Sequence, residues 1–126
     1  MNKEQNNNAK VIAFDLDGVL AQYNGFVSED DVKEPNPEVF NAIKILKEKG
    51  YKILIHSTRG DDFLKQYCKQ FDVPYDYINR RPDIEGKNPG KPIASVYVDD
   101  RAVNYNGQSA SELVETIENF QVHWRK

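Results

Sequence analysis

The chain has 126 residues, of which 39% are hydrophobic and 29% charged, a composition typical of one soluble globular domain. Its net charge of −3 lacks the basic surplus of nonspecific nucleic-acid binders, so a nucleic-acid partner is not expected, although a local basic patch is compatible with this charge. Cys68 is the only cysteine, which excludes an intramolecular disulfide, and no apolar run approaches the ~20 residues of a membrane span.

The first ten residues, MNKEQNNNAK, are polar and contain no apolar signal-peptide core. We therefore expect a disordered lead-in at residues 1–10 and a single domain over residues 11–126. No membrane association is expected, and the predicted location is the cytoplasm.

A short apolar run at residues 11–14, Val-Ile-Ala-Phe, leads directly into Asp15-Leu-Asp17-Gly18. Such a run, ending in charge and glycine, is typical of a buried strand inside a parallel sheet. Residues two apart in an extended chain face the same side, so Asp15 and Asp17 are predicted to enter one site at the carboxyl end of this strand. Gly18 permits the backbone turn that follows. Two adjacent carboxylates need a cation, a shared proton or divided roles.

Helix and strand patterns alternate along the rest of the chain. The Asn-Pro-Glu sequence at residues 36–38 predicts a helix that is capped by Asn36 and ends at Gly50. The apolar run at residues 51–55 predicts a second strand, and the polar sequence His-Ser-Thr-Arg-Gly follows it at once. Asp61 or Asp62 is expected to cap the next helix.

Two further strands are predicted, a weak one at residues 75–78 and another within residues 93–98, which ends in Asp-Asp-Arg. Ser109 or Ser111 is expected to start a final helix whose apolar residues face inward, namely Leu113, Val114, Ile117 and Phe120. This alternation predicts right-handed βαβ units and an α/β fold with a parallel sheet.

Three strand ends therefore carry polar groups that a parallel sheet gathers along one edge. They are Asp15 with Asp17, Ser57 with Thr58, and Asp99 with Asp100, while Lys91 lies just upstream of the last pair. A carboxylate cluster suits Mg²⁺, which prefers oxygen ligands and often also binds a substrate phosphate. A lysine, a hydroxyl and backbone amides would hold the remaining phosphate oxygens.

This arrangement resembles the haloacid dehalogenase (HAD) superfamily of phosphatases. The resemblance covers about residues 11–105 and rests on four motifs in the family's order: Asp15-Leu-Asp17-Gly-Val, Ser57 after a strand, Lys91, and Val98-Asp99-Asp100. It implies a three-layer Rossmann-like (HAD-like) α/β domain, with a central parallel sheet flanked by helices. The intervals between the motifs are too short for a cap domain, so the chain is similar to small capless members.

The resemblance also implies roles for these residues. Asp15 would be the nucleophile that becomes an aspartyl phosphate, and Asp17 the general acid and then the base. Ser57 and Lys91 would hold the transferring phosphoryl group. The metal ligands would be Asp15, the backbone carbonyl of Asp17, and Asp99. Asp100 would either bind the metal, directly or through water, or orient Lys91.

Several assignments stay open at this point. Lys87 is an alternative to Lys91, and Thr58 an alternative to Ser57. Arg59 and Arg101 follow strands of the site directly and would either clamp a substrate anion or form surface ion pairs. The candidates for substrate contact are thus Gly18, Thr58, Arg59 and Arg101.

The predicted activity is Mg²⁺-dependent hydrolysis of a phosphomonoester, a sugar phosphate or a similar small metabolite. The alternatives are a nucleotide or polynucleotide-end phosphatase and a noncatalytic HAD-fold binding domain. A homo-oligomer is compatible with the sequence, because capless members are often shielded by a neighbouring subunit. The loop at residues 21–33, with Tyr23 and Phe26, is expected to form a short flap over Asp15.

Overall fold

The computed structural model describes residues 10–21, 34–82 and 92–123. Three of the predicted features lie outside these ranges. They are nearly all of the expected lead-in, most of the expected flap with its two aromatic residues, and both candidate site lysines, Lys87 and Lys91.

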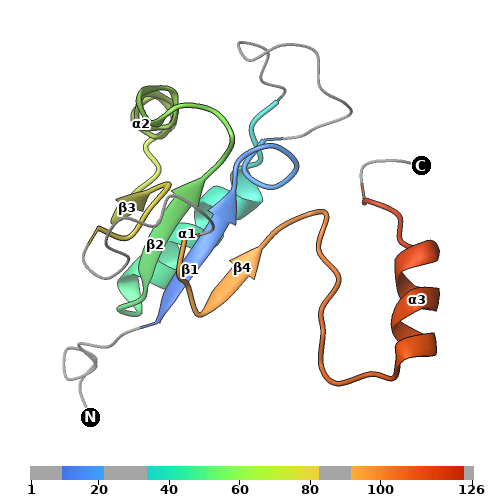
Figure 1. Ribbon diagram of the computed structural model, residues 1–126. Helices are drawn as coiled ribbons and strands as arrows, with labels where there is room; N and C mark the ends of the chain where they lie inside the picture. The colour runs from blue at the N-terminus through green and yellow to red at the C-terminus, as the bar shows by residue number, and fades with distance from the viewer. Residues whose placement is uncertain (1–9, 22–33, 83–91, 124–126) are drawn as a thin grey trace.

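A four-stranded parallel sheet forms the centre of the fold (Figure 1). Its strand order is β3-β2-β1-β4, so the strand that leads into Asp15 is an interior one. The strands are β1 (Val11–Asp15), β2 (Lys52–His56), β3 (Tyr77–Ile78) and β4 (Val96–Val98). In the register Asp15 lies beside His56 and Phe14 beside Val98, so the carboxyl ends of three strands meet at one edge. The predicted α/β fold with a parallel sheet is confirmed.

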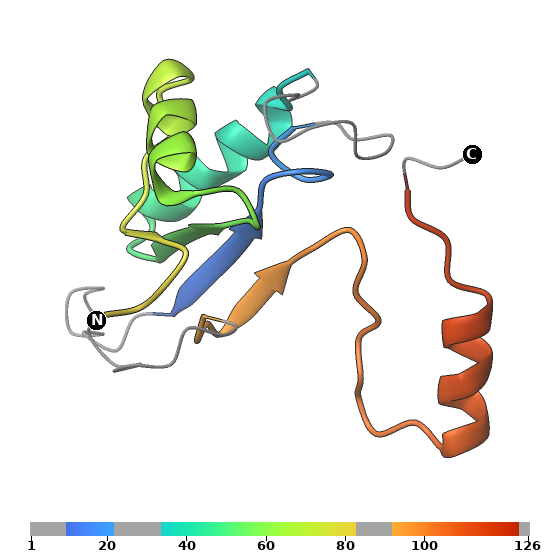
Figure 2. The same ribbon diagram turned by 45° about the horizontal axis from the view of Figure 1, so that its top comes forward.

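Helices α1 (Pro37–Glu48) and α2 (Asp61–Gln70) cover one face of this sheet (Figure 2). The core between them and the sheet consists of aliphatic and aromatic side chains that are almost fully buried, including Phe14, Ile43, Ile53, Ile55, Leu64, Tyr67 and Cys68. Since alternate residues of a strand face opposite sides, the remaining buried residues of β1 and β2, Val11, Ala13 and Leu54, belong to a separate small cluster with Tyr97.

The predicted caps of these two helices are wrong in detail. Pro37 begins α1 as expected, but the Asn36 side chain makes no capping hydrogen bond; its Nδ2 donates instead to the carbonyl of Val19, 3.1 Å away. Asn36 therefore ties the start of α1 to the loop after β1. In α2 the cap position is Gly60, and Asp61 lies one residue further on, in the first turn. There an acidic residue interacts favourably with the positive end of the helix dipole.

Helix α3 (Ala110–Glu118) begins as predicted and packs differently. Ser109 accepts a hydrogen bond from the amide of Glu112 while the Glu112 side chain accepts one from the amide of Ser109, a capping box. The predicted inward face is wrong, because α3 has no buried residue and Val114 and Ile117 are 53% and 56% exposed. In both views α3 lies beyond the β4 edge, away from the sheet (Figures 1 and 2).

The described residues contain these seven elements and no cap-sized insertion. Among them no helix has both the length and the apolar content needed to cross a membrane.

Candidate active site

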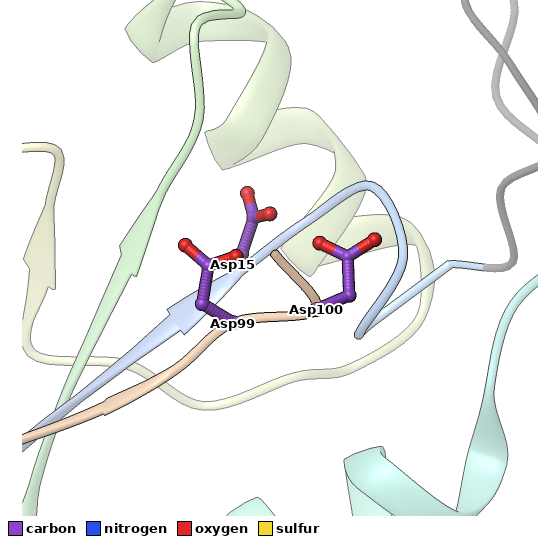
Figure 3. A group of neighbouring side chains, drawn as sticks. All are labelled: Asp15, Asp99 and Asp100. Atoms are coloured by element: carbon purple, nitrogen blue, oxygen red, sulfur yellow. The ribbon is translucent and has the colours of Figure 1, made fainter. Parts of the chain in front are cut away.

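Three carboxylates gather at the carboxyl edge of the sheet. Asp15 is the last residue of β1, and Asp99 and Asp100 follow β4 directly (Figure 3). One oxygen from each lies within 4.8 Å of the others. The pairing of β1 with β4 produces this group, since Phe14 and Val98 are register partners and the next residues are Asp15 and Asp99.

The surroundings of Asp15 disfavour its charged form. Burial is the main cause, and the negative charges of Asp99 and Asp100 add to it, so the pKa of Asp15 rises from 3.8 to about 7. A hydrogen bond from the Leu16 amide to Asp15 Oδ1, 2.9 Å long, opposes this rise without cancelling it. The cluster is therefore a place where a bound cation would relieve an unfavourable concentration of negative charge.

The loop after β1 brings Gly18 against Asp100. The loop is held by hydrogen bonds from the amide of Gly18 to the carbonyl of Ala21 and from the amide of Ala21 to the carbonyl of Leu16. Gly18 has a φ of +92°, and a Cβ at this position would overlap the Asp100 carboxylate. Glycine is therefore favoured at position 18 for two reasons. It tolerates the positive φ, and it has no Cβ where the Asp100 carboxylate approaches the backbone.

Asp17 does not join the carboxylate group. Its two oxygens accept hydrogen bonds from Nε and Nη2 of Arg59, at 2.9 and 3.0 Å, a bidentate ion pair. Arg59 is only 7% exposed, and its guanidinium also lies over the Phe63 ring, 4.9 Å from the centroid. The ion pair is thus internal, and not at the surface as one of the two predictions for Arg59 had it.

The loop after β2 is shaped by Asn79, which follows β3. Asn79 Oδ1 accepts from the amide of Ser57 at 2.9 Å, and its Nδ2 donates to Asp61 Oδ1 at 2.8 Å. Asn79 has a φ of +65°, a conformation that asparagine tolerates better than most residues. The Ser57 hydroxyl accepts from the amide of Arg59 at 3.1 Å, so Ser57 and Arg59 are positioned together.

An open cavity of about 610 Å³ lies at this edge of the sheet. Its lining includes charged side chains of both signs, namely Asp15, Asp61, Asp99, Arg59, Arg80 and Arg101. The predicted residues Ser57, Thr58 and Arg59 also line it.

We compared the chain with known proteins. No family model and no curated protein matches it. Several solved structures are similar to it, and two of them have a TM-score above 0.5. One is a conserved protein from Bacteroides thetaiotaomicron, which has 22% sequence identity and a TM-score of 0.62, the match covering 88% of this chain and 91% of that one. The other is a chain of the Pnkp1/Rnl/Hen1 RNA repair complex, with 22% identity and a TM-score of 0.53, the match covering 75% of this chain and 37% of that one.

The likeness is one of fold. At this level of identity it supports the α/β architecture and says nothing about individual site residues.

The structure thus brings most of the sequence-predicted residues to one edge. Asp15, Ser57, Thr58, Arg59, Asp99 and Arg101 line the cavity, and Gly18 and Asp100 lie against each other beside it. Asp17 is near the cluster in sequence, but its carboxylate points to Arg59. The roles of these residues stay predictions, as does the choice of Arg59 for a substrate anion, since its guanidinium binds Asp17 here.

Three further contributors were not among the sequence-predicted site residues. Asn79 and Arg80 follow a strand of only two residues, and its weak pattern gave the residues at its carboxyl end a low rank. His123, in the C-terminal tail, has Nε2 within 2.8 Å of the Gly18 carbonyl, a hydrogen bond between positions 105 residues apart. The position of Asn79 directly after a predicted strand was a usable signal, whereas His123 carried none.

Proposed function

We propose that the protein is a Mg²⁺-dependent phosphatase of the haloacid dehalogenase type, which hydrolyses a phosphomonoester of a small metabolite. The observation that carries this proposal is the group Asp15, Asp99 and Asp100, which stands at the carboxyl edge of a parallel sheet and lines or adjoins an open cavity. Ligands of open α/β sheets bind at the carboxyl ends of the strands. The four sequence motifs, in the order of the family they resemble, indicate which chemistry the site performs.

The carboxylate group fits a magnesium ion. All three side chains offer hard oxygen ligands within 4.8 Å of one another. Burial, and after it the negative charges of Asp99 and Asp100, raise the pKa of Asp15, and a cation would offset both. Asp15, Asp99 and Asp100 would hold the ion, together with the backbone carbonyl of Asp17. When bound, Mg²⁺ supplies the positive charge that lets a carboxylate approach an anionic phosphate.

Asp15 is the proposed nucleophile. Its free carboxylate oxygen forms a bond to phosphorus while the bond from phosphorus to the ester oxygen breaks, which leaves a phosphoryl group on Asp15. Leu16 fixes the other oxygen through its amide, so the carboxylate presents one oxygen for attack. Water then cleaves the new bond and restores Asp15.

Asp17 is the proposed proton donor to the leaving oxygen and the later base for water. Arg59 holds the Asp17 carboxyl in a fixed orientation by two hydrogen bonds. Ser57, placed by Asn79, and Lys91 are the proposed contacts to the phosphoryl oxygens.

A phosphatase acting on nucleic-acid ends is the second candidate. The fold likeness to a chain of an RNA repair complex and the arginines of the cavity favour it. The acidic net charge of the chain opposes the binding of a long nucleic acid.

A phosphate-release screen tests the proposal. Phosphorylated sugars, nucleotides and short 3′- and 5′-phosphorylated oligonucleotides would each be incubated with Mg²⁺ and the protein, with Asp15→Asn as the matched control. We expect release from at least one class, and a phosphoryl adduct on the Asp17→Asn variant by mass spectrometry. Release that Asp15→Asn leaves unchanged would contradict the proposal.

A further inference from the structure

The C-terminal segment after α3 comes back to the loop after β1 (Figure 2). His123 Nε2 lies 2.8 Å from the carbonyl oxygen of Gly18. A carbonyl oxygen only accepts hydrogen bonds, so the imidazole carries a hydrogen on Nε2 and donates it to Gly18. The chemistry proposed above gives His123 no role, although this bond ends directly beside the candidate metal site.

The segment from Asp100 to His123 begins and ends at the same residue. At its start the Asp100 carboxylate lies so close to Gly18 that a Cβ on Gly18 would overlap it. At its end the His123 ring binds the Gly18 carbonyl. The intervening residues 101–122, which include α3, therefore form a loop that is closed at Gly18 and adjoins the carboxylate cluster.

The backbone of Gly18 needs restraint, because glycine has more conformational freedom than any other residue. Its φ is +92°. Its amide donates to the carbonyl of Ala21 at 2.8 Å, and the amide of Val19 donates to the carbonyl of Leu16 at 3.2 Å. These two bonds lie within the loop itself. His123 adds a restraint from a distant part of the chain, and it acts on the Gly18 carbonyl directly.

The position of Gly18 limits the space that is open to Asp100. The Asp100 carboxylate contributes an oxygen to the group formed with Asp15 and Asp99, in which the three oxygens lie within 4.8 Å of one another. Since the Gly18 backbone bounds this carboxylate on one side, a shift of Gly18 would let it turn away from the other two. Residues that orient metal ligands in this way affect metal affinity without touching the ion.

We propose that His123 is a positioning residue of the metal site. Its hydrogen bond holds Gly18 against Asp100 and so keeps the Asp100 carboxylate directed toward Asp15 and Asp99. This inference rests on the metal site of the proposed function. One hydrogen bond changes an equilibrium by a factor of about 2 to 10, which sets the size of the expected effect on Mg²⁺ affinity.

Calorimetric titration with MgCl₂ tests the role of His123. In His123→Ala the Mg²⁺ affinity should fall about three- to tenfold. His123→Gln, whose amide offers an N–H donor, should restore part of the loss. Val114→Ala is the matched control, because it removes an exposed side chain from the same segment and should keep the wild-type affinity. Equal affinity in His123→Ala and wild type would overturn the proposal, as would an equal loss in Val114→Ala.

A double-mutant cycle tests the route through Asp100. The effect of His123→Ala on Mg²⁺ affinity is measured once in the wild-type background and once in Asp100→Asn. If His123 acts by placing the Asp100 carboxylate, its removal should change the affinity less than about twofold in Asp100→Asn. The same loss in both backgrounds would overturn this route.

The dependence of the rate on Mg²⁺ separates this inference from the proposed activity. In His123→Ala the Mg²⁺ concentration for half-maximal phosphate release should rise by the factor found calorimetrically, and the rate at saturating Mg²⁺ should stay close to that of wild type. A working phosphatase with an unchanged Mg²⁺ dependence would overturn the role of His123 and leave the activity. A lower Mg²⁺ affinity of His123→Ala, in a protein that releases no phosphate, would support this role and contradict the activity.

Discussion

Asp15 and Asp17 are separated by one residue and have opposite electrostatic surroundings. Asp17 has its counter-charge built into the chain, since Arg59 binds both of its oxygens. Asp15 lies among Asp99 and Asp100, and its pKa is raised to about 7 by burial and by their charges. One carboxylate thus has its counter-charge within the chain, whereas the proposed function assigns the other a cation from solution. This division suits a site in which one group positions a proton and the other attacks a phosphate.

The largest effect is expected from removing the nucleophile at the acidic end. Asp15→Asn preserves the shape of the side chain and cannot attack phosphorus, so phosphate release should fall by two orders of magnitude or more. Circular dichroism and the melting temperature serve as folding controls. Residual activity of more than about one per cent in a clean preparation would argue against an aspartyl phosphate.

Removal of Mg²⁺ should lower the activity nearly as much. With chelator the activity should drop toward that of Asp15→Asn and return on addition of Mg²⁺, because the carboxylate cluster then regains its cation. Ca²⁺ should inhibit, since its larger and looser coordination shell disturbs the geometry of the attack. Activity that survives dialysis against chelator would remove the cluster from the metal site.

Removal of Arg59, the partner of Asp17, should lower the stability of the fold. Arg59→Met leaves Asp17 partly buried without its partner, and we expect a loss of about 2–3 kcal/mol in the free energy of unfolding. Adding Asp17→Asn should restore part of that loss, because the stranded charge is then gone. Urea denaturation of both variants measures this. Equal stability of wild type and Arg59→Met would show that the ion pair contributes nothing.

The loop after β1 can be tested with a pair of glycine substitutions. Gly18 and Gly107 have similar φ values of +92° and +96°, but only at Gly18 would a Cβ meet a described atom, the Asp100 carboxylate. Each substitution by alanine should cost about 1–2 kcal/mol through the backbone. Gly18→Ala should also weaken Mg²⁺ binding, as measured by calorimetry, and Gly107→Ala should not. Equal Mg²⁺ affinity in both would separate Asp100 from the metal site.

The smallest effect concerns pH. The folded pKa of Asp15, about 7, lies above its ordinary value of 3.8, so the folded state binds this proton more tightly than the unfolded one. The contribution to stability is present in full below about pH 4 and is lost as the pH rises to about 7. Without metal, the melting temperature should therefore fall by a few degrees more in wild type than in Asp15→Asn over this range. Mg²⁺ at pH 8 should reverse the difference, and parallel curves would contradict the raised pKa.

Local patterns predicted the parts of the site that lie at strand ends. The apolar run before Asp15 and the one before Asp99 are each followed by acidic residues, and parallel pairing then brings them together. The partner of Asp17 was beyond such reasoning, because Arg59 is 42 positions away and reaches Asp17 only through the path of the loop after β2. The sequence shows that an arginine follows a strand, but it does not show which carboxylate that arginine will pair with.

The same limit applies to helix faces. Periodicity located the apolar stripe of α3 and its Ser109 cap, but a stripe indicates only that a face prefers burial. Whether that face meets the sheet depends on the connecting segment after β4, which carries no such pattern. Asn36 shows that local patterns can also mislead at a helix start. Its residue type is typical of a helix cap, but its side chain donates a hydrogen bond to the carbonyl of Val19 instead.

Because α3 is exposed, we expect it to resist local opening less well than the sheet does. Nine residues with no buried side chain are too few for a helix that is stable on its own. Its capping box is a local restraint, and the His123 hydrogen bond ties the segment after the helix to Gly18. Its backbone amides therefore become accessible to exchange through brief local opening, while those of β1 and β2 need the whole sheet to come apart. We therefore expect α3 to open and re-form independently of the unit made by the sheet, α1 and α2.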